Sequence, residues 1–259
     1  MNPEPDAVPP AAHGAARGVR LRWGFGTDIG LVRENNEDSL IALDPVFAVA
    51  DGMGGHEAGE VASALCVRTL AKIAELPGGG RKASAGVVQQ YLLSANARIR
   101  EATGSRAGTT LAGLVVVERS GQPNWLVMNI GDSRIYRLSA GVLTQISVDH
   151  SAVQEMVDAG HLTRAQAAVH PRRNVVTRAL GAGDEAAADF WLLPAAPGDR
   201  MLVCSDGLTG ELEDDAIAAI LAAEGDPQAA VDELIQAALR SGGRDNVTAI
   251  VIDAQPGDA

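Results

Sequence analysis

Cysteine and aromatic residues are scarce in this 259-residue chain. Its two cysteines, Cys66 and Cys204, each lie in an apolar stretch, so we expect buried, reduced thiols and neither a disulfide framework nor a zinc site. Phe, Trp and Tyr together make up 3% of the residues, so the core must consist mainly of Ala, Val, Leu and Ile. No apolar run approaches the ~18 residues that a transmembrane helix needs, so we expect no membrane-spanning segment.

Positive charge is also in deficit, since the formal net charge is -12. Such a balance repels nucleic acid and anionic membrane surfaces, so we expect neither as a partner. The excess carboxylates are free to bind divalent cations, although solubility alone explains much of the excess equally well. With 46% hydrophobic and 21% charged residues, the composition is that of a folded globular protein, and the reduced thiols favour the cytoplasm.

The beginning of the chain differs in composition from the rest. Residues 1–20 are rich in Pro and Ala and contain no apolar segment typical of a secretory signal, so we expect a disordered lead-in. The remaining length fits one domain over residues 21–254, with a short tail over 255–259. We expect this domain to be monomeric.

Strand and helix patterns occur in blocks along the chain. Strands are expected over residues 22–29, 39–43, 46–50, 109–117, 125–130, 133–138, 190–193, 201–204 and 247–252, and helices over 58–76, 86–102, 214–223 and 227–239. We expect Gly131-Asp132 to form a tight turn between two neighbouring strands, and the polar segment over about 147–180 to form a flap. Adjacent strand runs and paired helices favour antiparallel sheets covered by helix pairs, an α+β fold, over regular βαβ alternation.

Several apolar strands run directly into a turn that begins with Asp. Asp51, Asp132 and Asp206 each follow such a strand, and Asp245 stands just before the last one. Carboxylates, carbonyl oxygens and water are the ligands preferred by hard cations such as Mg²⁺ or Mn²⁺. Any one Asp-Gly turn is explained equally well by ordinary turn chemistry. Four such turns in one chain favour a metal site, provided that they converge in space.

A second candidate is the loop from Arg33 to Asp38, which follows the first expected strand. The planar guanidinium of arginine suits two phosphate oxygens and stays charged at any working pH. The alternative is an exposed loop that carries ordinary surface salt bridges. The loop therefore indicates phosphate binding only in combination with the acidic turns.

Six short motifs occur in an order that resembles the metal-dependent protein phosphatases of the phosphatase 2C type, and their bacterial branch in particular. They are Arg33 to Asp38, Asp51-Gly52-Met53-Gly54-Gly55-His56, Gly108-Thr109-Thr110, Gly131-Asp132-Ser133-Arg134, Ser205-Asp206-Gly207-Leu208 and Gly243-Arg244-Asp245-Asn246-Val247-Thr248. The resemblance covers about residues 26–253. It implies a four-layer αββα sandwich, in which two central antiparallel sheets are flanked by pairs of helices, with a flap subdomain beside the site.

The resemblance also implies a role for each acidic residue. Asp51 would bridge two metals, Mn²⁺ or Mg²⁺, with Asp206 and Asp245 completing one and the carbonyl of Gly52 contributing to the other. Asp38 would hold a metal-bound water. In bacterial members a third metal is shared between the equivalents of Asp132 and Asp206. In sequence order, the residues to which the resemblance assigns a role are Arg33, Asp38, Asp51, Gly52, Asp132, Asp206 and Asp245.

The implied reaction is hydrolysis of phosphoserine and phosphothreonine in proteins, opposing bacterial Ser/Thr kinases. Arg33 would anchor the phosphate while a water between the two metals attacks phosphorus in line. Relatives often carry a histidine directly after the Asp-Gly as proton donor, but Met53 stands there in this chain. His56 and a metal-bound water are the alternatives, and His150 and His170 are expected to cap or pack within the flap.

Two other functions fit part of the same pattern. A pseudophosphatase that only binds or regulates would have lost one of Asp51, Asp206 and Asp245, whereas all three are present. A hydrolase of small phosphoesters or nucleotides on the same fold is the second alternative. The segment from Gly24 to Gly30 does not fit the G-x-G-x-x-G pattern of dinucleotide sites, and the chain contains no P-loop.

Overall fold

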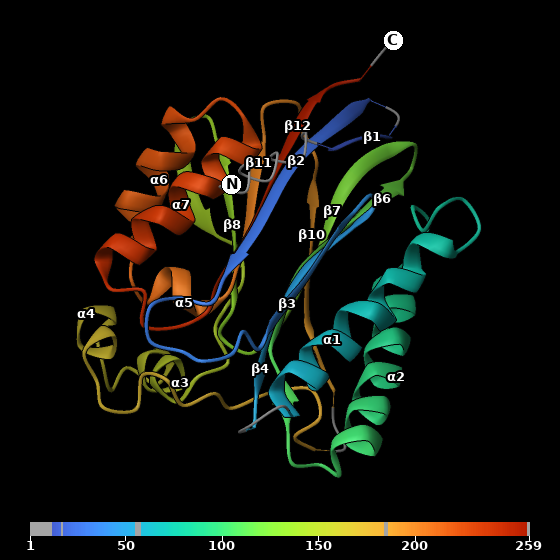
Figure 1. The fold of residues 1–259 in the computed structure, drawn as a ribbon. Coiled ribbons are helices and arrows are strands. Elements are labelled where there is room, and N and C mark those ends of the chain that lie inside the picture. The colour runs from blue at the N-terminus through green and yellow to red at the C-terminus, as the bar shows by residue number, and fades with distance from the viewer. Residues whose placement is uncertain (1–11, 17, 55–57, 184–185, 258–259) are drawn as a thin grey trace, which may run out of the picture.

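The computed structural model describes residues 12–16, 18–54, 58–183 and 186–257. These residues form two antiparallel sheets that pack face to face between two layers of helices (Figure 1). The four-layer αββα sandwich expected from the sequence is therefore confirmed. Among the described residues, none of the helices combines the length and the apolar character needed to cross a bilayer.

The first sheet contains both ends of the described chain. Its strands, in spatial order, are β1 (Ala12–Ala16), β2 (Val19–Asp28), β12 (Val247–Pro256), β11 (Arg200–Cys204), β8 (Arg134–Ser139) and β9 (Val142–Gln145). The lead-in expected to be disordered over residues 1–20 overlaps β1, which pairs with the start of β2, whereas residues 1–11 lie outside the described part of the chain. The expected tail also starts too early, since β12 continues to Pro256, opposite Val19.

The second sheet is built from the middle of the chain. Its strands, in order, are β10 (Asp189–Pro194), β7 (Gln122–Ile130), β6 (Leu111–Arg119), β4 (Val46–Met53) and β3 (Asp38–Leu43), and the short β5 (Gly108–Thr109) pairs with the end of β4. The expected tight turn at Gly131-Asp132 is a different feature in the structure. It carries the chain from β7 in this sheet to β8 in the other, so these strands do not form a hairpin.

The core between the sheets follows from the alternation of side chains along each strand. On β4, Phe47 and Val49 face the opposite sheet, while Val46, Ala48 and Ala50 face the helices. Trp23 on β2 meets Phe47 edge to face, with ring centroids 5.2 Å apart and an interplanar angle of 74°. Four of the eight aromatic residues, Trp23, Phe47, Trp125 and Trp191, belong to this core between the sheets.

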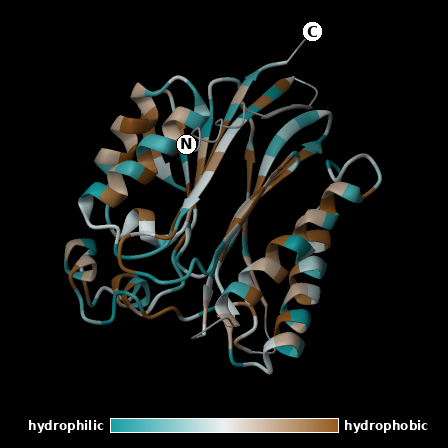
Figure 2. Ribbon diagram, viewed as in Figure 1, coloured by the Kyte–Doolittle hydropathy of each residue, from teal (hydrophilic) through white to brown (hydrophobic). Residues whose placement is uncertain are grey.

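One pair of helices covers each sheet. The helices α1 (Ala58–Ala71) and α2 (Ala85–Thr103), with a 3₁₀ turn over Lys72–Glu75, lie on the second sheet, and α6 (Asp214–Ala223) and α7 (Pro227–Ser241) lie on the first. Figure 2 shows these helices banded brown and teal, as expected for elements with one apolar face. The short α5 (Asp206–Thr209) follows β11 directly.

The segment over about 147–180 projects from one end of the sandwich, as expected for a flap (Figure 1). It contains the short helices α3 (Ala152–Asp158) and α4 (Arg164–Ala168), which begin at the side-chain caps Ser151 and Thr163. An isolated bridge between Ser151 and Val176 closes the flap on itself.

Candidate functional site

The aspartates predicted from the sequence lie at one end of the seam between the two sheets. Asp51 is near the end of β4 in the second sheet, and Asp38 is its antiparallel partner on β3. Asp206 begins α5 after β11, and Asp245 precedes β12, so both come from the first sheet. Asp132 lies in the crossing between the sheets. Five carboxylates from distant parts of the chain therefore share one region.

Burial and nearby negative charges raise the pKa values of Asp38, Asp51, Asp132 and Asp206. The pKa of Asp51 is raised well above its ordinary value, first by desolvation and then by the charges of Asp206, Asp38, Asp132 and Asp245. Desolvation, with the charge of Asp206 next, also raises the pKa of Asp132 to about 7. Carboxylates that share a buried site cannot all ionise unless a cation compensates them.

Asp38 is buried, and its neighbours are polar. The Ser205 hydroxyl donates to Asp38 Oδ2 at 2.8 Å, and the Thr248 amide donates to Ser205 Oγ at 3.0 Å. Desolvation raises the pKa of Asp38 to about 7, although hydrogen bonds from Thr248 and Ser205 oppose the shift. The carboxylate is thus fixed in place but kept easy to protonate.

The donor set fits a hard divalent cation, but the side chains are not gathered on one point. In the described ranges, no three Asp, Glu, His or Cys side chains form a ready-made metal-binding group. Asp245 Oδ2 accepts from Arg33 Nη2 at 2.6 Å, so this guanidinium balances part of the negative charge of the group. Small side-chain rotations, with carbonyl and water ligands added, would convert the group into an oxygen-rich cation site.

Arg33 reaches the acidic group from an exposed loop. Its side chain is 52% exposed, so the guanidinium can contact a solute while it pairs with Asp245. The ion pair with Asp245 is also the first cause of the raised pKa of Arg33. An exposed cation beside buried carboxylates is an arrangement suited to binding a phosphate at the edge of a metal site.

Asn246 holds the loop of Arg33 in position, a role that the sequence did not reveal. Its Nδ2 donates to the carbonyls of Ile29 at 2.9 Å and Asn35 at 3.0 Å, while its Oδ1 accepts from the Glu37 amide at 2.8 Å. The side chain of one residue thus satisfies three backbone groups of residues 29–37. The only indication in the sequence was that Asn246 follows Asp245, an expected metal ligand, within one of the six motifs.

Two glycines allow the backbone segments of the site to touch. A Cβ on Gly52 would lie 2.2 Å from the Gly59 carbonyl oxygen, and one on Gly207 would lie 2.0 Å from that of Asn246. Both distances are far below any real contact, so neither position can carry a side chain without a backbone shift. The Asp-Gly pairs therefore bring the β4 turn against α1 and the β11 turn against the Asn246 turn.

Hydrogen bonds to both its carbonyl and its amide fix the backbone of Gly131, the residue before Asp132. The Gly131 carbonyl accepts from the His150 amide at 2.8 Å and from Asn129 Nδ2 at 3.0 Å, and the Gly131 amide donates to His150 Nδ1 at 3.1 Å. Because Nδ1 accepts, the ring proton lies on Nε2, which is 3.1 Å from Asp189 Oδ2. His150 therefore does more than the capping or packing expected of it.

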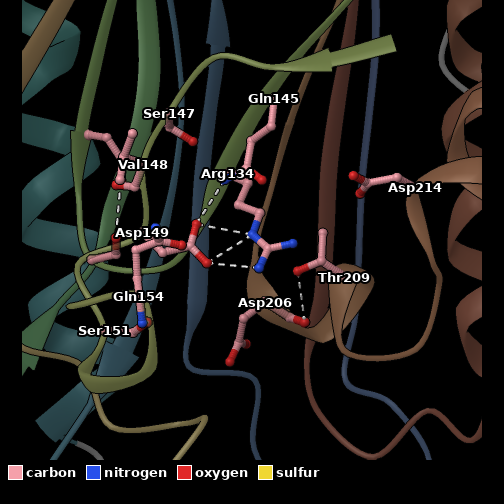
Figure 3. Close-up of polar contacts among 12 residues, drawn as sticks. Arg134, Gln145, Ser147, Val148, Asp149, Ser151, Gln154, Asp206, Thr209 and Asp214 are labelled. Carbon is pink, nitrogen blue, oxygen red and sulfur yellow. Dashed lines mark hydrogen bonds and ion pairs between the residues drawn. The ribbon is translucent and has the colours of Figure 1, made fainter. Parts of the chain in front are cut away.

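Arg134 makes a further link between the crossing and the flap. Its guanidinium binds both carboxylate oxygens of Asp149, with Nη2 2.7 Å from Oδ2 and Nε 3.0 Å from each oxygen. Figure 3 shows this fork with Asp206 on the adjacent turn. The start of the flap is thereby tied to β8, next to the acidic group.

The remaining expectations have mixed outcomes. Cys66 and Cys204 are free and buried, and desolvation raises the pKa of each thiol to about 12, so neither is a nucleophile. His170 Nδ1 accepts from the Arg172 amide at 3.1 Å, a capping role. Met53 ends β4, whereas His56 lies outside the described residues, so its role as proton donor stays a prediction.

Comparison with known proteins agrees with this arrangement. The family model described as Protein phosphatase 2C matches residues 34–242. The serine/threonine protein phosphatase PstP of Mycobacterium tuberculosis is 41% identical over 237 residues, which cover 90% of this chain and 45% of the relative. This chain thus spans about half the length of PstP. The serine/threonine phosphatase stp of Listeria monocytogenes is 34% identical over 244 residues, 88% of this chain and 94% of that protein.

Solved structures agree as well. The crystal structure of the PstP catalytic domain in complex with two manganese ions has a TM-score of 0.81 and 37% identity, covering 92% of this chain and 99% of that one. Sheet order, acidic turns and the extent of the family match all lead to one assignment. The chain belongs to the protein phosphatase 2C family.

Proposed function

We propose that this chain is the catalytic domain of a metal-dependent serine/threonine protein phosphatase. The observation that carries the proposal is the group of five carboxylates around Asp51 beside the exposed Arg33, in which burial raises the pKa values of Asp38, Asp51, Asp132 and Asp206. A phosphate ester and its metals are the partners that such a group needs. The names of the relatives PstP and stp support the same activity.

The assignment of ligands remains the one implied by the family. Asp51 would bridge two divalent cations, with Asp206 and Asp245 on one and the Gly52 carbonyl on the other, and Asp132 would serve a third. Such cations lower the pKa of a coordinated water and neutralise charge on phosphoryl oxygens. The two manganese ions of the PstP structure favour Mn²⁺, with Mg²⁺ as the alternative.

The residues of the chain supply positioning and proton handling. Arg33 would turn from Asp245 to the phosphate and orient it by two hydrogen bonds. Asp38, held by Ser205 at 2.8 Å, would accept a hydrogen bond from the attacking water and keep its lone pair directed at phosphorus. We propose phosphorylated proteins as substrates and an opposing Ser/Thr kinase as functional counterpart, in the cytoplasm.

The decisive experiment is hydrolysis of a phosphothreonine peptide, an aryl phosphate and a mononucleotide, each with Mn²⁺, Mg²⁺ or chelator. Activity should require added metal and should fall by on the order of 10²–10³ in Asp206→Ala and Asp245→Ala, the scale of losing electrostatic stabilisation of a transition state. Asp215→Ala, on the exposed start of α6, is the matched control and should keep full activity.

Activity that persists in chelator, or that survives in both site variants, would refute the metal-dependent mechanism. Turnover of the mononucleotide without turnover of the peptide would replace the proposed activity with that of a small-phosphoester hydrolase.

A further inference from the structure

The flap has a charge opposite to that of the chain as a whole. Residues 159–180 contain four arginines and no Asp or Glu, whereas the formal net charge of the protein is -12. The arginines are Arg164, Arg172, Arg173 and Arg178. All four are exposed.

Three of these arginines have guanidinium groups without a partner within the part of the chain that the structure describes. Arg178 Nη1 lies 3.1 Å from Asp189 Oδ1, so its charge is compensated. The guanidinium groups of Arg164, Arg172 and Arg173 make no ion pair or hydrogen bond with any described residue. We call these three residues the flap arginines. Their guanidinium groups are free to bind an external anion.

The flap is attached at both ends to the turns that carry the acidic group. Its beginning is fixed by the His150 amide, which donates to the Gly131 carbonyl at 2.8 Å. Its end is fixed by Leu180, which exchanges two backbone hydrogen bonds of 2.9 Å with Thr109, and the Thr109 hydroxyl donates to the Asp51 carbonyl at 2.9 Å. The flap arginines are therefore carried on a segment that borders the site.

Exposed apolar side chains also occur on the flap and on the loop before Arg33. Val169, between the flap arginines, is 79% exposed, and Leu31 and Val32, directly before Arg33, are 69% and 66% exposed. The Leu31 amide donates to the Gly243 carbonyl at 2.7 Å, so the backbone of this loop is fixed although its side chains face solvent. In Figure 1 this loop, between β2 and β3, lies at the same end of the molecule as α3 and α4. Exposed apolar residues together with unpaired arginines are typical of a protein-binding surface.

We propose that the flap arginines form a docking surface for phosphoprotein segments that carry acidic residues close to the phosphorylated residue. The proposal rests on the proposed phosphatase function and specifies its substrates. A protein with this net charge repels an acidic phosphopeptide at long range, so binding needs a local positive field. The flap arginines supply that field, and their planar forks pair with carboxylates. Leu31 and Val32 would contact apolar residues of the same segment.

The test uses two phosphothreonine peptides of equal length, one with Asp and Glu on both sides of the phosphothreonine and one with Asn and Gln there. An aryl phosphate reports on the catalytic group alone. The triple variant R164Q/R172Q/R173Q removes the positive charges and keeps polar side chains at exposed positions. R68Q, an exposed arginine on α1 without a described partner, is the matched control.

The wild-type protein and R68Q should prefer the acidic peptide by about 5–10-fold in kcat/KM, the scale of a few exposed charge contacts. This preference should disappear in the triple variant through a higher KM, and it should weaken in the wild type as salt increases. Hydrolysis of the aryl phosphate should be equal in all three proteins. Equal kcat/KM for both peptides in the wild type, or an unchanged preference in the triple variant, would overturn the proposal. Failure of the wild type on every substrate would instead refute the phosphatase function itself.

Discussion

At the scale of single residues, the acidic group is a source of instability in the metal-free protein. Asp38 and Asp132 each have a pKa of about 7 because burial disfavours their charged forms. In the unfolded chain the same side chains titrate near pH 3.9. The folded protein thus binds protons that the unfolded chain has already released.

The sign of the resulting pH dependence follows from this difference. Between about pH 4 and pH 7 the folded state binds more protons than the unfolded state, so raising the pH lowers the free energy of unfolding, and the effect levels off above pH 7. We expect Asp132→Asn, compared with wild type in chelator, to gain ~1–3 kcal/mol of relative stability between pH 5 and pH 8.

Urea unfolding of both proteins at the two pH values measures this difference. The comparison with the variant removes the contribution of all other titrating groups. A variant that loses relative stability as the pH rises would show that Asp132 is stabilised as a carboxylate in the metal-free protein. Added Mn²⁺ should stabilise the wild type at pH 8, because a ligand that binds only the folded state stabilises it.

At the scale of elements, His150 couples the flap to the crossing between the two sheets. Its amide and Nδ1 hold the Gly131 peptide, its carbonyl accepts from the Thr177 amide at 2.8 Å, and its Nε2 faces Asp189 on β10. One residue thus contacts Thr177 near the end of the flap, β10 and the turn that carries Asp132. The position of His150 should therefore determine where Asp132 lies relative to the other carboxylates of the acidic group.

Two substitutions separate the contacts of the His150 ring. Asn can keep an acceptor near the position of Nδ1, whereas Gln keeps a donor near Nε2 and loses the acceptor for the Gly131 amide. We expect His150→Gln to need ~10-fold more Mn²⁺ for half-maximal activity, the usual scale for residues that orient metal ligands, and His150→Asn to stay within ~3-fold of wild type.

The readout is activity on the aryl phosphate across a Mn²⁺ titration, with thermal unfolding as the control for folding. Asp189→Asn should behave like His150→Asn, because it weakens the Nε2 contact and the ion pair with Arg178 but leaves the hydrogen bonds between His150 and Gly131 in place. If Asn and Gln shift the Mn²⁺ requirement equally, the hydrogen bond to Gly131 has no special role.

At the scale of the whole molecule, the two sheets share one core. Trp23 and Phe47 come from different sheets and meet between them, and both are buried. An interface of this kind makes independent unfolding of either sheet unfavourable. The seam that carries the acidic group should therefore form only when both sheets are folded.

Phe47→Ala tests this coupling. Loss of the ring from a closed interior should destabilise the protein by ~3–5 kcal/mol, whereas Phe25→Ala, at a side chain 38% exposed on β2, should cost less than about 1 kcal/mol. Tryptophan fluorescence and far-ultraviolet circular dichroism should give coincident urea transitions in all three proteins. Separate transitions would mean that the sheets unfold independently.

Much of the fold could be predicted because its signals are local. The apolar alternation over Val46–Met53 and the Asp-Gly pair that ends it depend only on neighbouring residues. The pairing of β8 with β11 could not be predicted in this way, since adjacent strands usually pair and nothing local marks Gly131 as a crossing between sheets. The expected hairpin failed for that reason.

The candidate site shows the same division. The acidic residues were recognisable by their ordered motifs, and the structure brings them together. The groups that fix them, such as Asn246 and the His150 ring, act through contacts between residues more than 15 positions apart. A pattern in one sequence does not contain those distances. The side-chain geometry of a metal-loaded site likewise depends on the cation, so the ligand roles stay predictions.

The close approach of the backbone at Gly52 and Gly207 limits how this protein can change over time. Because even a methyl group would collide with a carbonyl oxygen at either position, these glycines should tolerate replacement as poorly as the aspartates beside them. The exposed positions of the flap arginines carry no such constraint. Descendants of this chain could acquire new target proteins while the interior of the site remained the same.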